Sequence, residues 1–276
     1  MLHAPPGRLT LGVLLPTRLD HPSQELLAME AERGRVDALF APAPHTAEAP
    51  DPVTLLSGLS GATDHIGLVA AGSPSGWEPH QLVRRHTSLD VLSTGRAGWH
   101  LTDPAGTPAD EALRLWTAAH RDGTPGAVPP VQRQPVLFRT DEPATRDTFT
   151  ARHADVVLTA PRDRRSARRR YAAIADGVRA AGRNPEHVLI WSELTVSTMD
   201  GPARLADHLQ RCHEERTADG FLLSFPEQPG LLVDFVDHVV PELWRRGLFP
   251  NAYEGPNLRA TLGLPEHAPI PGGVHA

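Results

Sequence analysis

Residues 51–71, "DPVTLLSGLSGATDHIGLVAA", contain the signals of a helix followed by those of a strand. Asp51 is a preferred N-cap residue, and Pro52 suits the first position of a helix. The run "IGLVAA" at 66–71 is apolar throughout, without the alternation of a strand that has one face in water. Such a run is typical of a parallel strand covered on both faces, so the unit indicates an α/β protein.

The same pairing of strand and helix recurs along the chain. The predicted strands are residues 9–15, 36–41, 66–71, 96–101, 135–139, 155–159, 188–196 and 220–225. Eight strand–helix pairs predict a (β/α)8 TIM barrel, a single domain over 1–276 whose proline-rich tail at 249–276 wraps the barrel or frays. The alternative is a doubly wound open sheet, but no G-x-G-x-x-G turn follows the first strand.

Composition excludes several classes of protein. The net charge is -6 and no basic stripe is present, so we expect no nucleic-acid partner. No apolar run approaches the roughly 20 residues that span a bilayer, and a secretory signal is absent, which predicts a cytoplasmic protein without membrane contact. All 27 basic residues are arginine. The absence of lysine excludes a P-loop and a Schiff-base mechanism.

Polar side chains gather where the predicted strands end, which is where barrels carry their active sites. The fourth strand ends in "GWHLTD", which places His100 and Thr102 at this rim, and His45 and Ser224 follow other strands. The rim has many hydroxyls and few charges, so it suits an uncharged small molecule better than a metal. We take His45, Thr102 and Ser224 as candidate substrate-binding residues and His100 as the candidate catalytic residue. The alternative is that His100 is a hydrogen-bonded histidine at a strand end without a catalytic role.

One stretch of motifs resembles a known family. Glu78-Pro79, Arg84-Arg85, Leu89-Asp90, Gly95-Arg96 and Gly98-Trp99-His100 occur in this order between 78 and 100. They resemble the bacterial luciferase-like flavin monooxygenases, in the branch of the nitrilotriacetate and dibenzothiophene sulfone monooxygenases, and later segments resemble the same branch. The resemblance covers nearly the whole chain and implies the same barrel.

The resemblance also implies a chemistry. It implies a monooxygenase that takes reduced FMN, delivered by a flavin reductase, and O2 to a small organic substrate, with a role in secondary metabolism. Ser73, Ala43 and Thr140 occupy positions that the family places near the flavin. The family pairs barrels through early helices, and the small residues of 51–62 permit close approach of two helices, so a homodimer is expected.

The chain also departs from the family. Ala43 stands about where the family has an aspartate, and Asp141 and Glu142 stand where it has a serine–glycine phosphate loop. Carboxylates would repel a phosphate. The family's insertion after the fourth strand is nearly absent between Asp103 and Pro108. A second class of function therefore stays open: a flavin-independent member that is a cofactor-free enzyme or a partner chain without catalytic activity of its own.

A metal site has little support. His208, Cys212 and His213 lie close together in a predicted late helix. Three ligands without a fourth on such a helix are usually surface residues, so we expect no metal.

Overall fold

Eight parallel strands close into a barrel in the computed structural model, which describes residues 7–16, 18–43, 50–73, 77–102, 107–122, 130–141, 148–198, 201–225 and 229–266. Each strand pairs with the next along the chain, and β8 pairs with β1. The strands are β1 Thr10–Leu14, β2 Ala38–Ala41, β3 Gly67–Gly72, β4 Ala97–Leu101, β5 Val136–Thr140, β6 Val156–Thr159, β7 Leu189–Thr195 and β8 Gly220–Ser224. The predicted barrel and its eight strands are confirmed.

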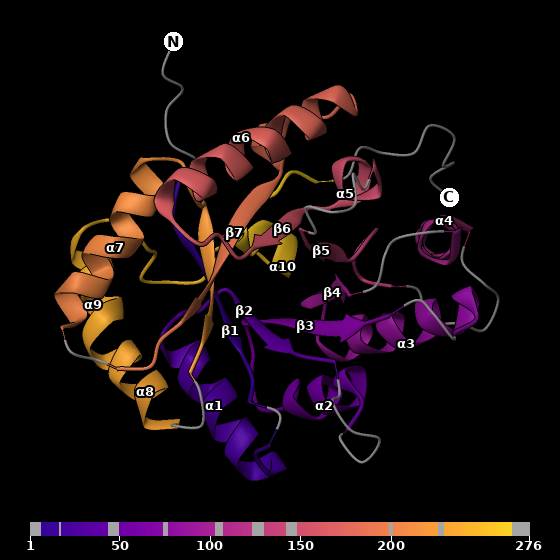
Figure 1. Cartoon of the computed structure of the whole chain (residues 1–276). Helices are drawn as coiled ribbons and strands as arrows, with labels where there is room; N and C mark the ends of the chain where they lie inside the picture. The colour runs from indigo at the N-terminus through magenta and orange to yellow at the C-terminus, as the bar shows by residue number, and fades with distance from the viewer. Residues whose placement is uncertain are drawn as a thin grey trace.

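Helices surround this barrel (Figure 1). They are α1 His21–Arg33, α2 Pro52–Leu59, α3 Pro79–Leu92, α4 Thr107–Asp122, α5 Thr148–His153, α6 Arg164–Ala180, α7 Pro202–Glu214, α8 Pro229–Asp234, α9 Val240–Arg245 and α10 Leu258–Thr261, with short η1 Pro185–His187 and π-helical η2 Phe235–Val239. Within the described part of the chain, no helix combines the length and the apolar character that a bilayer crossing needs.

The helix boundaries follow the signals in the sequence. The Asp51 side chain accepts a hydrogen bond from the backbone N–H of Thr54 at 2.9 Å, so it caps α2 as predicted. Gly182 and Gly247 follow α6 and α9 with φ of +80° and +68°. This is the left-handed region that glycine adopts without strain, and it ends both helices.

Side chains fill the inside of the barrel in layers, each contributed by alternate strands. The strand register places Gly12, Val69, Phe138 and Trp191 in one layer, and Phe40, His100, Leu158 and Leu222 in the next toward the strand ends. A Cβ on Gly12 would lie 2.6 Å from a ring atom of Trp191, so only glycine leaves room for that ring. The barrel is therefore a packed core up to the layer of His100.

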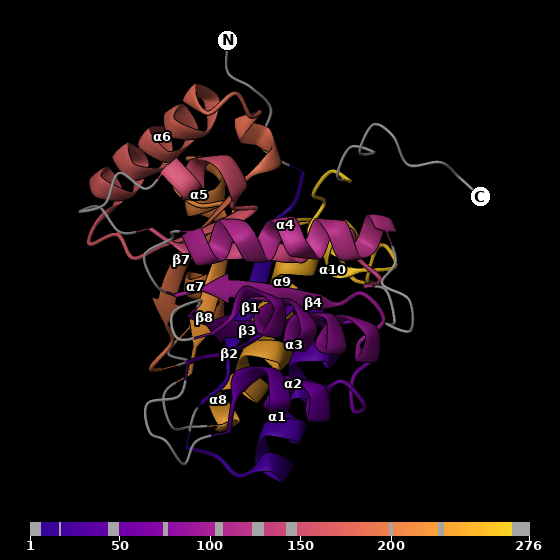
Figure 2. The ribbon, with the colours of Figure 1, turned by 90° about the vertical axis from the view of Figure 1, so that its right-hand side faces the viewer.

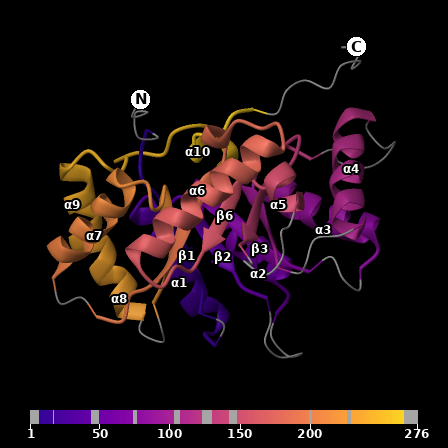
Figure 3. The same ribbon diagram turned by 45° about the horizontal axis from the view of Figure 1, so that its top comes forward.

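The tail closes the N-terminal end of the barrel. Leu258 and Leu262 pack in the same buried cluster as Phe138 and Trp191. In Figure 2 the arrow of β4 points away from α10, and Figure 3 shows α10 beside α6 at this end. Of the predicted tail, residues 249–266 thus cover the strand starts, and 267–276 lie outside the described residues.

Three aspartates fasten the same end. Asp37, Asp155 and Asp219 directly precede or adjoin the starts of β2, β6 and β8. They accept the backbone N–H of Leu11 at 2.7 Å, of Leu137 at 2.9 Å and of Ile190 at 2.8 Å in the neighbouring strands. Each also has a side-chain partner: Arg8, Arg259 and Tyr171. The N-terminal end is therefore held by polar groups that are paired with one another.

Candidate functional site

His100 projects from β4 into the barrel near its C-terminal end. Its Nε2 lies 3.0 Å from the hydroxyl of Thr140 on β5, and its ring meets the edge of Phe40 with centroids 6.2 Å apart. The side chain is half-buried, whereas Phe40, Leu158 and Leu222 in its layer are buried. His100 is thus the accessible polar group of an otherwise apolar layer.

The imidazole of His100 is neutral at pH 7. Burial and the nearby guanidinium of Arg139 lower its pKa to about 4. Arg139 is itself buried on the outer side of β5 and donates to the carbonyl of Leu101 at 3.1 Å. A neutral imidazole paired with a hydroxyl offers one donor and one acceptor to a ligand above it.

The layer above His100 holds the remaining polar groups of the barrel mouth. By the strand register it consists of Leu14, Ala71, Thr140 and Glu193. Beyond it, Ser224 donates to the hydroxyl of Thr195 at 3.0 Å. The mouth therefore presents an apolar floor with neutral donors and acceptors on two sides and one carboxylate.

Glu193 lies within the predicted strand 188–196 and is absent from the candidate site residues chosen from the sequence. Trp191 faces the interior, where it packs against Phe40 and Phe138, so Glu193 and Thr195 follow on the same face of β7. Glu193 is exposed, and partial burial of its carboxyl raises its pKa. The period of two starting from a buried tryptophan was the signal that could have found it.

The other candidate residues lie just beyond the strands. Ser73 and Thr102 directly follow β3 and β4, and Ala43 lies two residues after β2; all three are half-buried. Thr140 is joined to His100, as described above. His45 lies outside the described residues. The structure thus brings His100, Thr140 and Ser224 to one end of the barrel and leaves His45 unplaced.

The acidic residue after β5 is compensated. Asp141 forms a two-point ion pair with the guanidinium of Arg170 on α6. The negative charge of Asp141 is therefore balanced by Arg170, which weakens the repulsion of a phosphate that the isolated carboxylate was expected to cause. Glu142 lies outside the described residues.

The motif residues that carry the family resemblance serve the scaffold. Asp90 accepts the backbone N–H groups of Val131 at 2.6 Å and Gln132 at 2.9 Å. The buried guanidinium of Arg96 donates to the carbonyls of Ser60, Thr63 and Ile66. Trp99 is buried on the outer side of β4 against the ring of His86, with centroids 4.8 Å apart. The interpretation of Trp99 as packing is confirmed.

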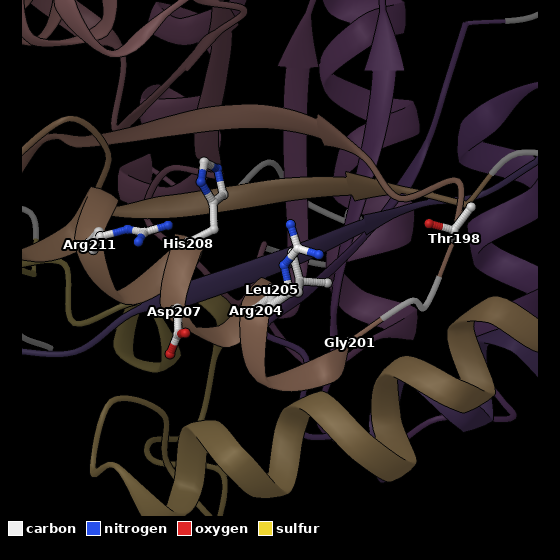
Figure 4. A pocket seen from close by; sticks show the side chains of 7 residues that line it. All are labelled: Thr198, Gly201, Arg204, Leu205, Asp207, His208 and Arg211. Carbon is white, nitrogen blue, oxygen red and sulfur yellow. The ribbon is translucent and has the colours of Figure 1, made fainter.

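A separate cavity of about 670 Å³ lies along the outer face of α7 (Figure 4). Its lining includes Arg204, His208 and Arg211. Cys212 Sγ lies 3.8 Å from His208 Nε2, whereas His213 is buried in the core. Within the described ranges, no group of three or more His, Cys, Asp or Glu side chains is placed to hold a metal ion.

Comparison with known proteins gives relatives but no matching family model. The chain is 28% identical to one of the two chains of pristinamycin IIA synthase from Streptomyces pristinaespiralis, over 78% of this chain and 79% of that protein. It is 24% identical to a component of nitrilotriacetate monooxygenase from Aminobacter aminovorans, over 83% and 81%. The first alignment runs over 332 residues, more than the 276 of this chain, so that relative holds segments that are missing here.

A shorter match concerns the other chain of the same synthase. Over 76 residues this protein is 40% identical to that second polypeptide of pristinamycin IIA synthase, also from Streptomyces pristinaespiralis. The match is 25% of this chain and 27% of that protein, so the two chains are of similar length.

The fold has close counterparts among solved structures. DmoA from Hyphomicrobium sulfonivorans superimposes with a TM-score of 0.78 and 19% identity, over 92% of each chain. At this identity the likeness establishes the barrel, and the named monooxygenases among the relatives establish the kinship. The chain is therefore a homologue of the luciferase-like monooxygenases and has their closed eight-stranded barrel.

Proposed function

We propose that this protein is a monooxygenase that takes reduced FMN and O2 to a small organic substrate at the mouth of its barrel. The observation that carries the proposal is the neutral His100–Thr140 pair at the edge of the apolar layer. This pair lies at the C-terminal end of the barrel, where TIM-barrel enzymes have their active sites. When bound, reduced flavin supplies the electrons that activate O2.

The mouth fits the ring of a flavin. A flat, mostly apolar ring system requires an apolar surface, which Leu14, Ala71 and Leu222 provide. Its polar edge requires neutral hydrogen-bonding groups, which His100 and Thr140 provide. The ion pair of Asp141 with Arg170 removes the uncompensated charge from the β5 edge, where a phosphate would otherwise be repelled.

The residues of this chain have distinct tasks in the proposal. The apolar layer of Phe40, Leu158 and Leu222 closes the site from below and keeps water out of the barrel. His100 and Thr140 orient the ring, and Ser73 and Ala43 follow the neighbouring strands β3 and β2. Thr102 and Ser224 contact the substrate, and His45 is proposed as a further contact.

The partners are proposed from the relatives. A flavin reductase would supply the reduced FMN, because a diffusible reduced flavin needs a source. The two pristinamycin IIA synthase chains among the relatives support a role in secondary metabolism. The monooxygenases among the relatives favour an oxygenase over a flavin-free protein. We also propose a homodimer, which light scattering would show as twice the 29.9 kDa chain mass, whereas a mass near 29.9 kDa would reject it.

Flavin retention tests the proposed function. Reduced FMN, mixed with the protein under nitrogen and passed through an ultrafilter, should be retained by the wild type. It should be lost with Leu14→Trp, because a large ring then fills the mouth, and kept with Leu26→Trp on the exposed face of α1. Ala71→Leu is a second filling variant if the first does not fold. Equal retention by filled and control variants, or none by the wild type, rejects the proposal.

A further inference from the structure

Among the described residues of the barrel mouth, the Glu193 carboxylate has no polar partner. Its neighbours in the same layer are Leu14, Ala71 and Thr140, and the Thr140 hydroxyl is already joined to His100. In the part of the chain that the structure describes, Glu193 takes part in no hydrogen bond and no ion pair. Its own strand and β8 add only the hydroxyls of Thr195 and Ser224, which bond to each other.

No described cation faces Glu193 from the strands around it. In the layer below, Phe40, Leu158 and Leu222 are apolar, and His100 is neutral. Arg139 lies on the outer side of β5, where it donates to Leu101. The situation differs from Asp37, Asp155 and Asp219, whose carboxylates each have a guanidinium or hydroxyl partner.

A ligand that covers the mouth removes water from this carboxylate. The loss of hydration is unfavourable unless the ligand supplies a cation or a hydrogen-bond donor in exchange. A ligand that brings a second carboxylate there would add repulsion to the lost hydration.

We propose that Glu193 is a specificity-determining residue, and that the substrate carries a basic nitrogen whose N–H group donates to the Glu193 carboxylate. The inference rests on the proposed function only in taking the barrel mouth as the substrate site. It assigns a chemical class to that substrate: an amine with an apolar body, whose nitrogen lies at Glu193, the register partner of Leu222. Polycarboxylates are disfavoured as substrates, because their carboxylates would be repelled by the carboxylate of Glu193.

Three probes of one shape and different charge test the proposal without flavin. Benzylamine, benzyl alcohol and benzoate share a ring and differ in the group that would meet Glu193. At pH 8, ligand-observed NMR titration should show benzylamine, whose amine is protonated, binding about ten- to hundredfold tighter than benzyl alcohol, as a charge-assisted hydrogen bond requires. Benzoate should bind more weakly than either.

Glu193→Gln removes the charge and keeps the shape, so the preference for benzylamine should fall to less than about threefold. The matched control is Glu111→Gln on α4, an exposed glutamate outside the barrel, which should keep the wild-type preference. Glu193→Ser serves as a second variant. An equal affinity of the wild type for the amine and the alcohol, an unchanged preference in both Glu193 variants, or no binding of any probe overturns the proposal.

The same proteins separate this proposal from the proposed function. Reduced FMN retention depends on the floor and on His100, so Glu193→Gln should retain it. Amine preference with no flavin retention would overturn the flavin proposal alone. Flavin retention without amine preference would overturn the assignment of Glu193 alone.

Discussion

The two ends of the barrel use polar residues in opposite ways. At the N-terminal end, Asp155 is buried and accepts hydrogen bonds from Arg259, at 2.7 Å, and from the backbone N–H of Leu137 in the neighbouring strand β5. At the C-terminal end, Glu193 is exposed and meets no described partner, and His100 has a single hydroxyl neighbour. Groups that are fully paired hold the fold, while groups with free hydrogen-bonding capacity can bind a ligand.

The difference also explains what the family motifs report. Arg96 and Asp90 form hydrogen bonds with the backbone at the N-terminal end and with the side chains of Thr63 and Gln132. Their presence therefore reports a shared barrel. In the proposed function, the chemistry depends on His100, Thr140 and Glu193 at the other end of the barrel. Of these three residues, the motif contains only His100, its last residue.

The largest change in the free energy of unfolding is expected at the N-terminal end of the barrel, where the polar groups are paired. Arg259→Met leaves the carboxylate of Asp155 buried without its cation, which should lower the free energy of unfolding by about 3–5 kcal/mol. Arg179→Met on exposed α6 removes only a surface ion pair with Asp176 and should cost less than about 1 kcal/mol. Denaturant unfolding followed by circular dichroism measures both.

The wild type should unfold in a single cooperative step in that experiment, because α10 joins the strand starts into one core. If Arg259→Met lowers the free energy of unfolding no more than Arg179→Met does, the proposed difference between the two ends of the barrel is wrong.

A second effect concerns acid stability. Burial and the charge of Arg85 lower the pKa of His86 to about 4, below its ordinary 6.5. The unfolded chain therefore takes up this proton first, so the stability is complete above about pH 6.5 and is lost as pH falls toward 4. His86→Gln should reduce the loss between pH 7 and 4.5 by up to about 3 kcal/mol. Identical pH profiles of the two proteins in denaturant unfolding would refute this.

The smallest effect is expected at the mouth. Thr195→Ala removes the acceptor of one exposed hydrogen bond from Ser224 and should change the free energy of unfolding by less than about 0.5 kcal/mol. A thermal unfolding scan measures it. A loss above about 1.5 kcal/mol would show that the polar groups of the mouth support the fold, contrary to the contrast drawn here.

The fold was predictable because its signals are local and repeated. Apolar runs, the Asp51 cap, and glycines 182 and 247 each act within a few residues, and eight repeats leave few topologies. The site was less predictable. His100 was chosen as a candidate from its position at the end of a predicted strand. Its partner Thr140 lies 40 residues away, and only the strand register brings the two together.

The sequence could not predict which carboxylates at the barrel mouth are paired with a cation. Asp141 and Arg170 are 29 residues apart and meet because β5 and α6 are brought together by the closed barrel. Glu193 is the opposite case: it has no described partner, because the neighbouring strands place no cation beside it. Both facts depend on distances between elements, which no local pattern encodes.

The most direct test of the account is the affinity for FMN of three proteins: the wild type, His100→Asn and His100→Leu, measured by calorimetry. Asparagine keeps a neutral donor and acceptor, so it should preserve the affinity, whereas leucine should weaken binding about ten- to hundredfold and cost little stability. An unchanged affinity in His100→Leu would contradict the account and leave His100 as a hydrogen-bonded residue at a strand end.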